Sequence, residues 1–241
     1  VIDAYKKKAY GFQGRLHQLN KESQAEAHIN LMVEEAISTS AIEGEILNRE
    51  EVRSSVSRFL GISLTKQKGY FPKEDGISEM LINVRESINS NLSKEKICHW
   101  HKSLLHGSDG HYPKPIVKGE YRDGDVQIVK GDLYGNEEII FEGPGGNRAQ
   151  VTAEMDKFIE WYNETSPLNE NGINIPGPAK AAIAHLWFVS IHPFEDGNGR
   201  IARAIAEHAL FQDFDSPPLF SISMAINDDR GDYYKQLAST N

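Results

Sequence analysis

Several features are nearly absent from this 241-residue sequence, and each absence removes a class of protein. It contains one cysteine, Cys98, so no disulfide can form within the chain, and burial explains this thiol better than reactivity does. No apolar run approaches the roughly 18 residues that span a bilayer, and nothing resembles a signal peptide. We therefore expect a cytoplasmic protein without a membrane segment.

The sequence is also poor in positive charge. It has 26 Lys and Arg against 35 Asp and Glu, which gives a formal net charge of −9. Non-specific binding of nucleic acid requires a basic surface, and no helix with basic flanks suited to reading DNA is found. We expect no nucleic-acid partner for this portion, and a nucleic-acid regulator would need a module beyond Asn241. Internal repeats of 20–50 residues are missing as well, which excludes a solenoid.

What is present is mostly helical in pattern. Apolar residues three and four apart predict a helix over 24–43, which Gly44 would end. Asn48 followed by Glu51 resembles a capping box that opens a second helix. Further helices are expected near residues 77–92, 94–106, 149–163, 178–191, 198–212 and 230–238.

A loop rich in glycine, lysine and proline, residues 61–76, divides this pattern in two. We predict an N-terminal helical extension over 1–75 and a core over 76–241. The sequence starts at Val1 and stops at Asn241 directly after a helical stretch. We therefore expect it to be a portion of a longer protein.

One region departs from the helical pattern. Residues 126–129 and 138–141 are short β-prone runs on either side of the turn-rich residues 131–136. They predict a small β-hairpin that projects from the helical body. An ordinary surface hairpin would have the same pattern.

The chemistry is concentrated in residues 192–203, which read HPFEDGNGRIAR and lie between two apolar helices. The glycines let the backbone approach a ligand closely, and the unpaired N–H groups at the start of the second helix favour a phosphate. Arg200 and Arg203 are three residues apart, so they project from nearly one face of that helix. Two guanidinium groups at a helix start suit a polyphosphate better than a single carboxylate.

Two other side chains in this segment can take part in catalysis. A histidine such as His192 can accept the proton of an attacking hydroxyl, and a carboxylate such as Asp196 suits Mg²⁺ bound to phosphates. Phe194 is better explained as an anchor in the core. The segment is not an EF-hand, and there is no Walker-type sequence to indicate a P-loop ATPase.

In combination, these residues resemble the signature of the Fic (filamentation induced by cAMP) family. Its eight specified residues are all met between His192 and Arg203, and the wider likeness covers roughly 94–238. That wider region includes GEYR at 119–122 and the tyrosines Tyr233 and Tyr234. The resemblance implies a mainly α fold: a Fic-type helical core with a small β-hairpin flap, preceded by the N-terminal helical extension.

The resemblance also implies a reaction, the transfer of AMP from ATP to a hydroxyl side chain of a target protein. His192 would be the general base, Asp196 would hold Mg²⁺, and the remaining motif residues would bind the nucleotide. The anion hole is implied at Gly197, Asn198 and Gly199, and the outer phosphates at Arg200 and Arg203. Gly199 resembles the AMP-transferring branch, whereas the kinase-like Doc branch typically has Lys there; phosphocholine transfer stays open.

Two further implications concern the surroundings of the motif. The hairpin over 126–141 would be the flap along which an extended segment of the target protein docks. Asn227, Tyr233 and Tyr234 would line the adenine pocket, although core packing explains them equally well. A homodimer is an open alternative for the assembly.

Residues 39–44, TSAIEG, resemble the family's inhibitory motif, in which a glutamate at the end of an N-terminal helix holds the site inactive. Glu43 paired with Arg203 would occupy the guanidinium that orients the γ-phosphate, leaving the α-phosphate misaligned for attack. A solvated glutamate near a helix end is the alternative. Glu43 could instead position a water that removes AMP.

Three functions therefore compete at this stage. The first is a protein adenylyltransferase inhibited by Glu43. The second is a de-AMPylase that uses the same site, and the third is a binding module that only senses ATP. The presence of His192 speaks against the third, because sensing a nucleotide needs no base.

Overall fold

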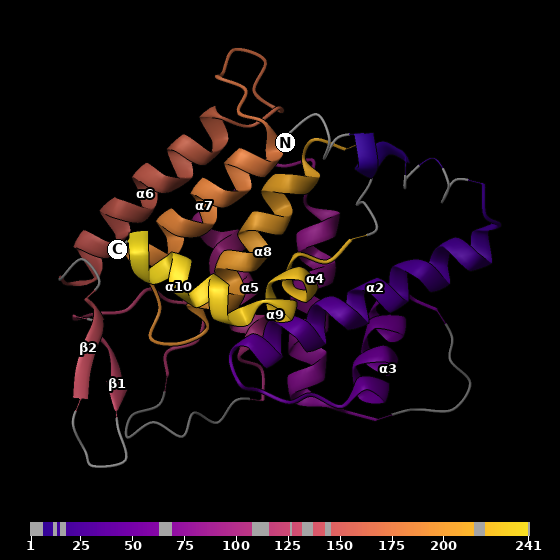
Figure 1. Ribbon diagram of the computed structural model, residues 1–241, viewed down its shortest axis with the longest axis horizontal. Helices are drawn as coiled ribbons and strands as arrows, with labels where there is room; N and C mark the ends of the chain where they lie inside the picture. Colours follow the sequence, from indigo (N-terminus) through magenta and orange to yellow (C-terminus); the bar gives the residue numbers. More distant parts are fainter. Residues whose placement is uncertain are drawn as a thin grey trace.

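The structure, a computed structural model, describes residues 7–11, 14, 18–62, 69–107, 116–125, 127–131, 137–142, 146–214 and 220–240. Helices dominate it, and a single two-stranded sheet projects from one end (Figure 1). The elements in chain order are α2 (Lys21–Ile42), α3 (Arg49–Phe59), α4 (Pro72–Glu86), α5 (Lys94–Leu104), β1 (Gln127–Gly131), β2 (Glu137–Glu142), α6 (Arg148–Glu164), α7 (Gly177–Ile191), α8 (Asn198–Phe211), α9 (Ile222–Asp228) and α10 (Arg230–Thr240).

The mainly α fold expected from the sequence is confirmed, with three differences of detail. The helix expected near 77–92 is α4, which starts earlier because Pro72 occupies its first turn. Proline fits that position, since its missing N–H has no partner in a helix start anyway. The short helix α9 was not predicted. The third difference lies at Cys98, which is only half-buried, although burial raises the pKa of its thiol to about 11.

The core lies where α7 packs along α8 and where α4, α5 and α6 close around them. Large apolar and aromatic side chains fill it without exposure: Trp100, Phe158, Tyr162, Phe188, Phe194 and Phe211. The Trp100 indole N–H donates to Asn83 Oδ1 at 2.7 Å, which satisfies its one polar group. No helix in the described part of the chain is both long and apolar enough to cross a membrane.

The long helix α2 lies on the other side of the molecule, against α3, α4 and α9 (Figure 1). A buried carboxylate joins it to α9, because Glu35 accepts hydrogen bonds from the hydroxyl groups of Ser221 and Ser223 and from the Ser223 N–H. These bonds compensate the carboxylate for lost water. They fix the C-terminal half of α2 against α9, and α2 also contacts α8.

The two strands pair antiparallel, with Gln127 opposite Glu142 and Gly131 opposite Glu137, and a register shift follows Ile128. They form the predicted hairpin, which extends away from the helices (Figure 1). The turn expected at 131–136 lies mostly outside the described residues.

Candidate active site

The motif occupies the junction of α7 and α8. Helix α7 ends at Ile191, and His192 follows in the left-handed region with φ 51° and ψ 57°. It is the only residue other than glycine with a positive φ among those described. Gly197, with φ 78°, precedes α8, and no described side chain caps that helix. The N–H groups of the first turn of α8 therefore face the loop.

Arg122 holds the loop from the side of the core. Its Nε donates to the carbonyl oxygen of His192 at 2.8 Å, and its Nη2 donates to that of Ile191 at 3.3 Å. The Arg122 N–H donates to Pro193 O at 2.8 Å. A guanidinium group thus satisfies the last carbonyls of α7 and supports a backbone conformation that costs a non-glycine residue roughly 1 kcal/mol or more.

Phe194 anchors the middle of the loop. It is fully buried, and its ring stacks on that of His101 at a centroid distance of 3.8 Å and an angle of 4°. The His101 ring nitrogens bond to Asp196 O at 3.2 Å and to the Gly119 N–H at 2.8 Å. Burial lowers the pKa of His101 to about 4, so it is neutral, and its Nε2–H donates to Asp196 O.

The side chain of Asn198 closes the loop on itself. Its Nδ2 donates to Phe194 O at 2.8 Å, and its Oδ1 accepts from the Phe194 N–H at 2.9 Å. This amide therefore shapes the loop, and any anion hole at 197–199 would be made by backbone N–H groups.

His192 has the properties of a neutral base. Burial is the main reason why its pKa lies below the ordinary value of 6.5, and Arg122 lowers it further. Its Nδ1 lies 3.3 Å from Val189 O, an acceptor, so Nδ1 carries the hydrogen and Nε2 carries the lone pair. Glu43 and Asp196 are close enough to raise this pKa in part.

Asp196, expected from the sequence to hold a metal, lies at the end of the loop next to Gly197. Its Oδ1 accepts from the Gly197 N–H at 2.6 Å, and its Oδ2 lies 3.9 Å from Arg200 Nη2. The side chain is 41% exposed, so it can be reached from solvent. The described residues contain no group of three or more metal-binding side chains. A metal here would take its other ligands from phosphate and water, as Mg²⁺ commonly does.

Arg203 is held by the end of α2. It is 1% exposed, and its Nη2 lies 2.7 Å from Glu43 Oε1. Thr39 supplies two more acceptors: its Oγ1 accepts from Arg203 Nε at 2.8 Å, and its carbonyl accepts from Nη2 at 2.9 Å. The structure therefore brings Glu43 and Arg203 together, with Thr39 of the TSAIEG stretch as a second partner.

The Glu43 carboxylate also lies against the start of α8. A Cβ atom at Gly199 would be 2.3 Å from Glu43 Oε1 and 3.3 Å from Arg203 Nη1. The carboxylate thus occupies the position at a helix N-terminus where an anion is stabilised. A phosphate in this position would have to displace it.

Arg200 has a carboxylate partner of its own, which the sequence did not reveal. Its Nη1 donates to Glu45 Oε2 at 2.6 Å. The other oxygen of Glu45 lies 3.1 Å from Lys73 Nζ. Both motif arginines are therefore paired with glutamates from the short segment between α2 and α3.

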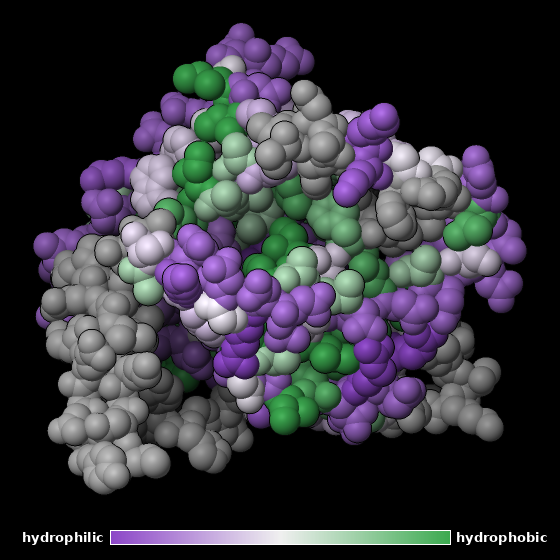
Figure 2. All heavy atoms as spheres, in the orientation of Figure 1, coloured by the Kyte–Doolittle hydropathy of each residue, from purple (hydrophilic) through white to green (hydrophobic). Residues whose placement is uncertain are grey.

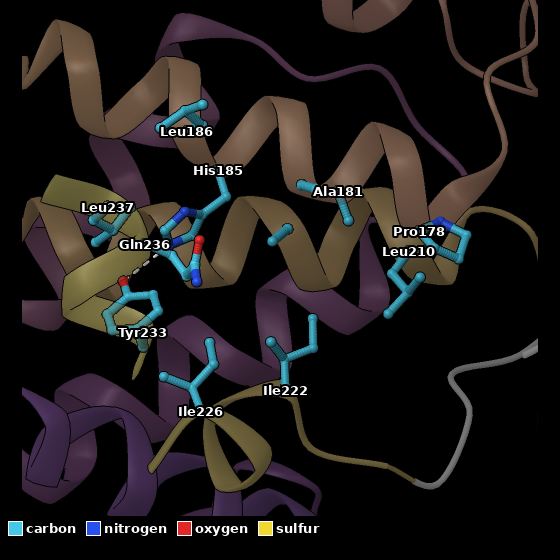
Figure 3. Close-up of a pocket in the computed structure, with 12 residues that line it drawn as sticks. Pro178, Ala181, His185, Leu186, Leu210, Ile222, Ile226, Tyr233, Gln236 and Leu237 are labelled. Carbon is cyan, nitrogen blue, oxygen red and sulfur yellow. Dashed lines mark hydrogen bonds between the residues drawn. The ribbon is translucent and has the colours of Figure 1, made fainter. Parts of the chain in front are cut away.

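A cavity of about 440 Å³ lies next to Arg203, between α7, α8, α9 and α10. Arg203 Nη1 lies 3.5 Å from the hydroxyl of Tyr233, which lines the cavity and bonds to His185 Nε2 at 3.1 Å (Figure 3). The other lining residues are mostly apolar: Pro178, Ala181, Ala182, Leu186, Ala206, Leu210, Ile222, Ile226, Gln236 and Leu237. Figure 2 shows apolar side chains around a hollow on this face.

Of the three residues expected at an adenine pocket, Tyr233 and Tyr234 lie together, with ring centroids 5.2 Å apart, and Asn227 lies elsewhere. Tyr233 lines the cavity, whereas the hydroxyl of Tyr234 donates to Ile42 O at 2.9 Å. Asn227 is exposed on α9. Tyr233 and Tyr234 thus lie near Arg203 and Glu43, while no contact found among the described residues joins Asn227 to the motif.

Sequence reasoning missed Arg122, His101 and Glu45 as parts of the site. Arg122 lies in GEYR, whose arginine could have been singled out because it directly precedes the hairpin. Glu45 is two residues from Glu43, and a second acid at that spacing is a weak signal. Nothing near His101 in the sequence indicates that it stacks on Phe194.

The sequence matches two family models. The model described as the Fic/DOC family matches residues 91–210, and a domain of unknown function, DUF4172, matches residues 2–62. A Fido domain-containing protein of Dictyostelium discoideum is 31% identical over 115 residues, which are 46% of this chain and 71% of that protein. Protein adenylyltransferase fic-1 of Caenorhabditis elegans is 22% identical over 206 residues, which are 84% of this chain and 35% of that protein.

The chain thus spans about a third of the length of the adenylyltransferase relatives that match most of it. Among solved structures, a Fic domain-containing signalling protein of Bacteroides thetaiotaomicron has a TM-score of 0.67 at 20% identity, with 96% of this chain and 79% of that chain covered. This likeness concerns the fold. Together with the motif residues at the junction of α7 and α8, the family match and the Dictyostelium relative show that the chain belongs to the Fic/DOC family.

Proposed function

We propose that this chain is a protein adenylyltransferase that moves AMP from ATP to a hydroxyl group of a target protein. The observation that carries the proposal is the junction of α7 and α8. There, a neutral histidine, an uncapped helix start and two arginines converge on one loop. The relatives named protein adenylyltransferase support the same reaction class.

In this reaction the hydroxyl oxygen of the target attacks the α-phosphorus of ATP. The bond from that phosphorus to the bridging oxygen breaks, and pyrophosphate leaves with the bonding electrons. Nε2 of His192 accepts the hydroxyl proton, which such a base makes roughly 10²–10⁴-fold faster. Backbone N–H groups at Asn198 and Gly199 would stabilise the charge on the α-phosphate, and that of Gly197 would join them on leaving Asp196 Oδ1.

Mg²⁺ fits the exposed carboxylate of Asp196, because a metal bound to phosphates needs only one or two protein carboxylates. When bound, it would neutralise phosphate charge. The phosphates beyond the α position would meet Arg200 and Arg203. For contact with the adenine ring of ATP, Tyr233 and Tyr234 are better supported than Asn227. Tyr233 lies beside Arg203, and Tyr234 lies beside the end of α2.

The N-terminal extension, residues 1–75, would inhibit the core, residues 76–241; we call this inhibition by Glu43 the brake. Glu43 is paired with Arg203 and lies against Gly199, so it competes with phosphate both for the guanidinium and for the helix start. ATP bound alongside Glu43 would have its α-phosphate displaced from the line of attack. Low basal activity follows.

The hairpin is the proposed docking place for the target protein. In the described part of the chain, its sheet has two strands, so each strand has an edge without a partner. An extended segment of the target could add to such an edge through main-chain hydrogen bonds. This would place a target hydroxyl beside His192.

Labelling with ATP that carries ³²P at the α or the γ position tests the reaction. We expect label on protein from the α position only, and a loss of about 10²–10⁴-fold in the His192→Ala variant with an unchanged melting temperature. The control is His99→Ala, at an exposed histidine on α5. Label from the γ position would indicate a kinase, and label that persists without His192 would contradict the proposal.

The Glu43→Gly variant tests the brake. Freeing Arg203 from a charged hydrogen bond should raise labelling about tenfold or more, because such bonds contribute roughly 1.5–3 kcal/mol. The control is Glu22→Gly at the exposed start of the same helix, which should leave labelling unchanged. Equal labelling by Glu43→Gly and the parent would rule out the brake.

The position of Glu43 against the helix start also supports the reverse activity as a second candidate. A carboxylate there could hold a water near an AMP-modified side chain. Loss of AMP from a pre-modified protein, dependent on Glu43 and faster than transfer, would favour a de-AMPylase.

A further inference from the structure

The pair formed by Glu45 and Arg200 is separate from the pair formed by Glu43 and Arg203. Its oxygen–nitrogen distance is 2.6 Å, and the side chains of Arg200 and Glu45 are 9% and 23% exposed. In such partial burial an ion pair is stronger than on an open surface. A nucleotide can therefore bind to Nη1 of Arg200 only after the ion pair with Glu45 has broken.

The contact does not use the hydrogen-bonding capacity of Arg200 in full. Only Nη1 bonds to Glu45, and Nε is buried with no hydrogen-bond partner within the described residues. A guanidinium group can bind an oxyanion through two parallel bonds, and phosphate oxygens are suitable acceptors for both. The unsatisfied Nε indicates that another acceptor belongs on this arginine.

Glu45 already has a second positively charged partner, Lys73. Its Oε1 lies 3.1 Å from Lys73 Nζ at the start of α4. If Arg200 turned to a phosphate, Glu45 would keep one positive neighbour and would not be left as an uncompensated charge. The exchange is therefore far less costly than breaking an isolated buried pair.

We infer that Glu45 is a nucleotide-selecting residue: it competes with the outer phosphates of ATP for Arg200, with Lys73 as its alternative partner. The inference rests on the proposed function in one respect, that ATP binds along α8. Because AMP has no outer phosphate, it does not need Arg200, and Glu45 lowers the affinity for ATP but not for AMP. Glu43 acts on Arg203 in parallel, so each carboxylate controls one arginine.

Isothermal titration with ATP and with AMP tests this on the intact chain. The Glu45→Gln variant keeps the shape of the side chain but removes its charge. We expect ATP to bind about tenfold more tightly and AMP to bind as in the parent. The matched control is Glu50→Gln, an exposed acid in the first turn of α3, which should leave both affinities unchanged.

Lys73→Met provides a second, opposite change. Without its alternative partner, Glu45 should hold Arg200 more firmly, so ATP binding weakens in the parent background. In the Glu45→Gln background the same substitution should have a clearly smaller effect, and the difference measures the coupling. Melting temperatures verify that each variant is folded.

Equal ATP affinity for folded Glu45→Gln and the parent would overturn the inference, and so would an equal gain for AMP. Failure of the proposed function would look different. If ATP tightens in Glu45→Gln but no variant labels protein, the role of Glu45 stands and AMP transfer does not.

Discussion

The backbone of the motif loop and the side chains of its two arginines are held in different ways. The loop from His192 to Asn198 is fixed by partners in the core, namely Arg122, His101 and the Asn198 amide. The guanidinium groups of Arg200 and Arg203 are instead held by Glu45 and Glu43, at and just after the end of α2. The loop is thus held by contacts with the core, whereas the two guanidinium groups are held by ion pairs with glutamates.

This difference bears on the inhibition proposed for Glu43. If the resting state were inactive because the loop was misshapen, activation would require refolding of the junction between α7 and α8. Because the loop is already formed, the proposed inhibition would be relieved once Arg200 and Arg203 are freed from Glu45, Glu43 and Thr39. Changes on the loop side should therefore lower activity and stability together, and changes on the arginine side should separate them.

The largest effect is expected on the loop side, from Arg122→Met. The carbonyl groups of Ile191 and His192 would lose their donor, which costs roughly 1–3 kcal/mol for each buried group left unpaired. A loop displaced by about 1 Å should lose about 100-fold in labelling rate. Thermal melting and α-³²P labelling measure the two effects.

Arg148→Met is the control for that change. Arg148 forms an exposed ion pair with Glu120 at 2.7 Å, and such pairs contribute about 0–1 kcal/mol. Its loss should alter neither stability nor labelling appreciably. Full activity in Arg122→Met would contradict the view that contacts with the core hold the motif loop in its active shape.

A smaller effect of opposite sign is expected on the arginine side, from Thr39→Val. The substitution keeps the volume but removes the Oγ1 that accepts from Arg203 Nε. Stability should fall by roughly 1–2 kcal/mol, while labelling should rise a few-fold because Arg203 is held less firmly. Ser40→Ala is the control, since the Ser40 hydroxyl is buried without a hydrogen-bond partner on the described residues. Labelling that falls with stability in Thr39→Val would contradict the separation.

The smallest effect concerns pH and sharpens the role of His192. Since burial lowers its pKa below 6.5, His192 is already neutral at pH 7. In the Glu43→Gly background, kcat/KM for labelling should be nearly constant from pH 7 to 8 and should fall only below pH 6.5, where the base becomes protonated. A limb centred above pH 7 would mean that another group is the base.

The helices and the motif could be predicted because their signals are local. Asn48 caps α3 through the N–H groups of Glu50 and Glu51, which is one half of the predicted capping box. The other half is not formed, because the Asn48 N–H donates to Glu74 Oε1 at 3.4 Å and not to Glu51. The strands β1 and β2 pair as their β-prone runs suggested. The predicted start of α4 is too late, because the sequence pattern assigns Pro72 to a loop although proline suits the first turn of a helix equally well.

The supports of the site could not be predicted because they join distant parts of the chain. Arg122 and His192 are 70 residues apart, and Arg200 and Glu45 are 155 apart. No spacing rule links such positions in one sequence. Glu43 was found only because the family resemblance attached a meaning to its position.

The contact between Glu43 and Gly199 makes the residues tolerated at these two positions depend on each other. Any residue larger than glycine at 199 would push its Cβ into the Glu43 carboxylate, whose flexible end would have to move away. A side chain at position 199 and the docked Glu43 carboxylate therefore compete for the same space beside the start of α8. In this chain glycine leaves that space to Glu43.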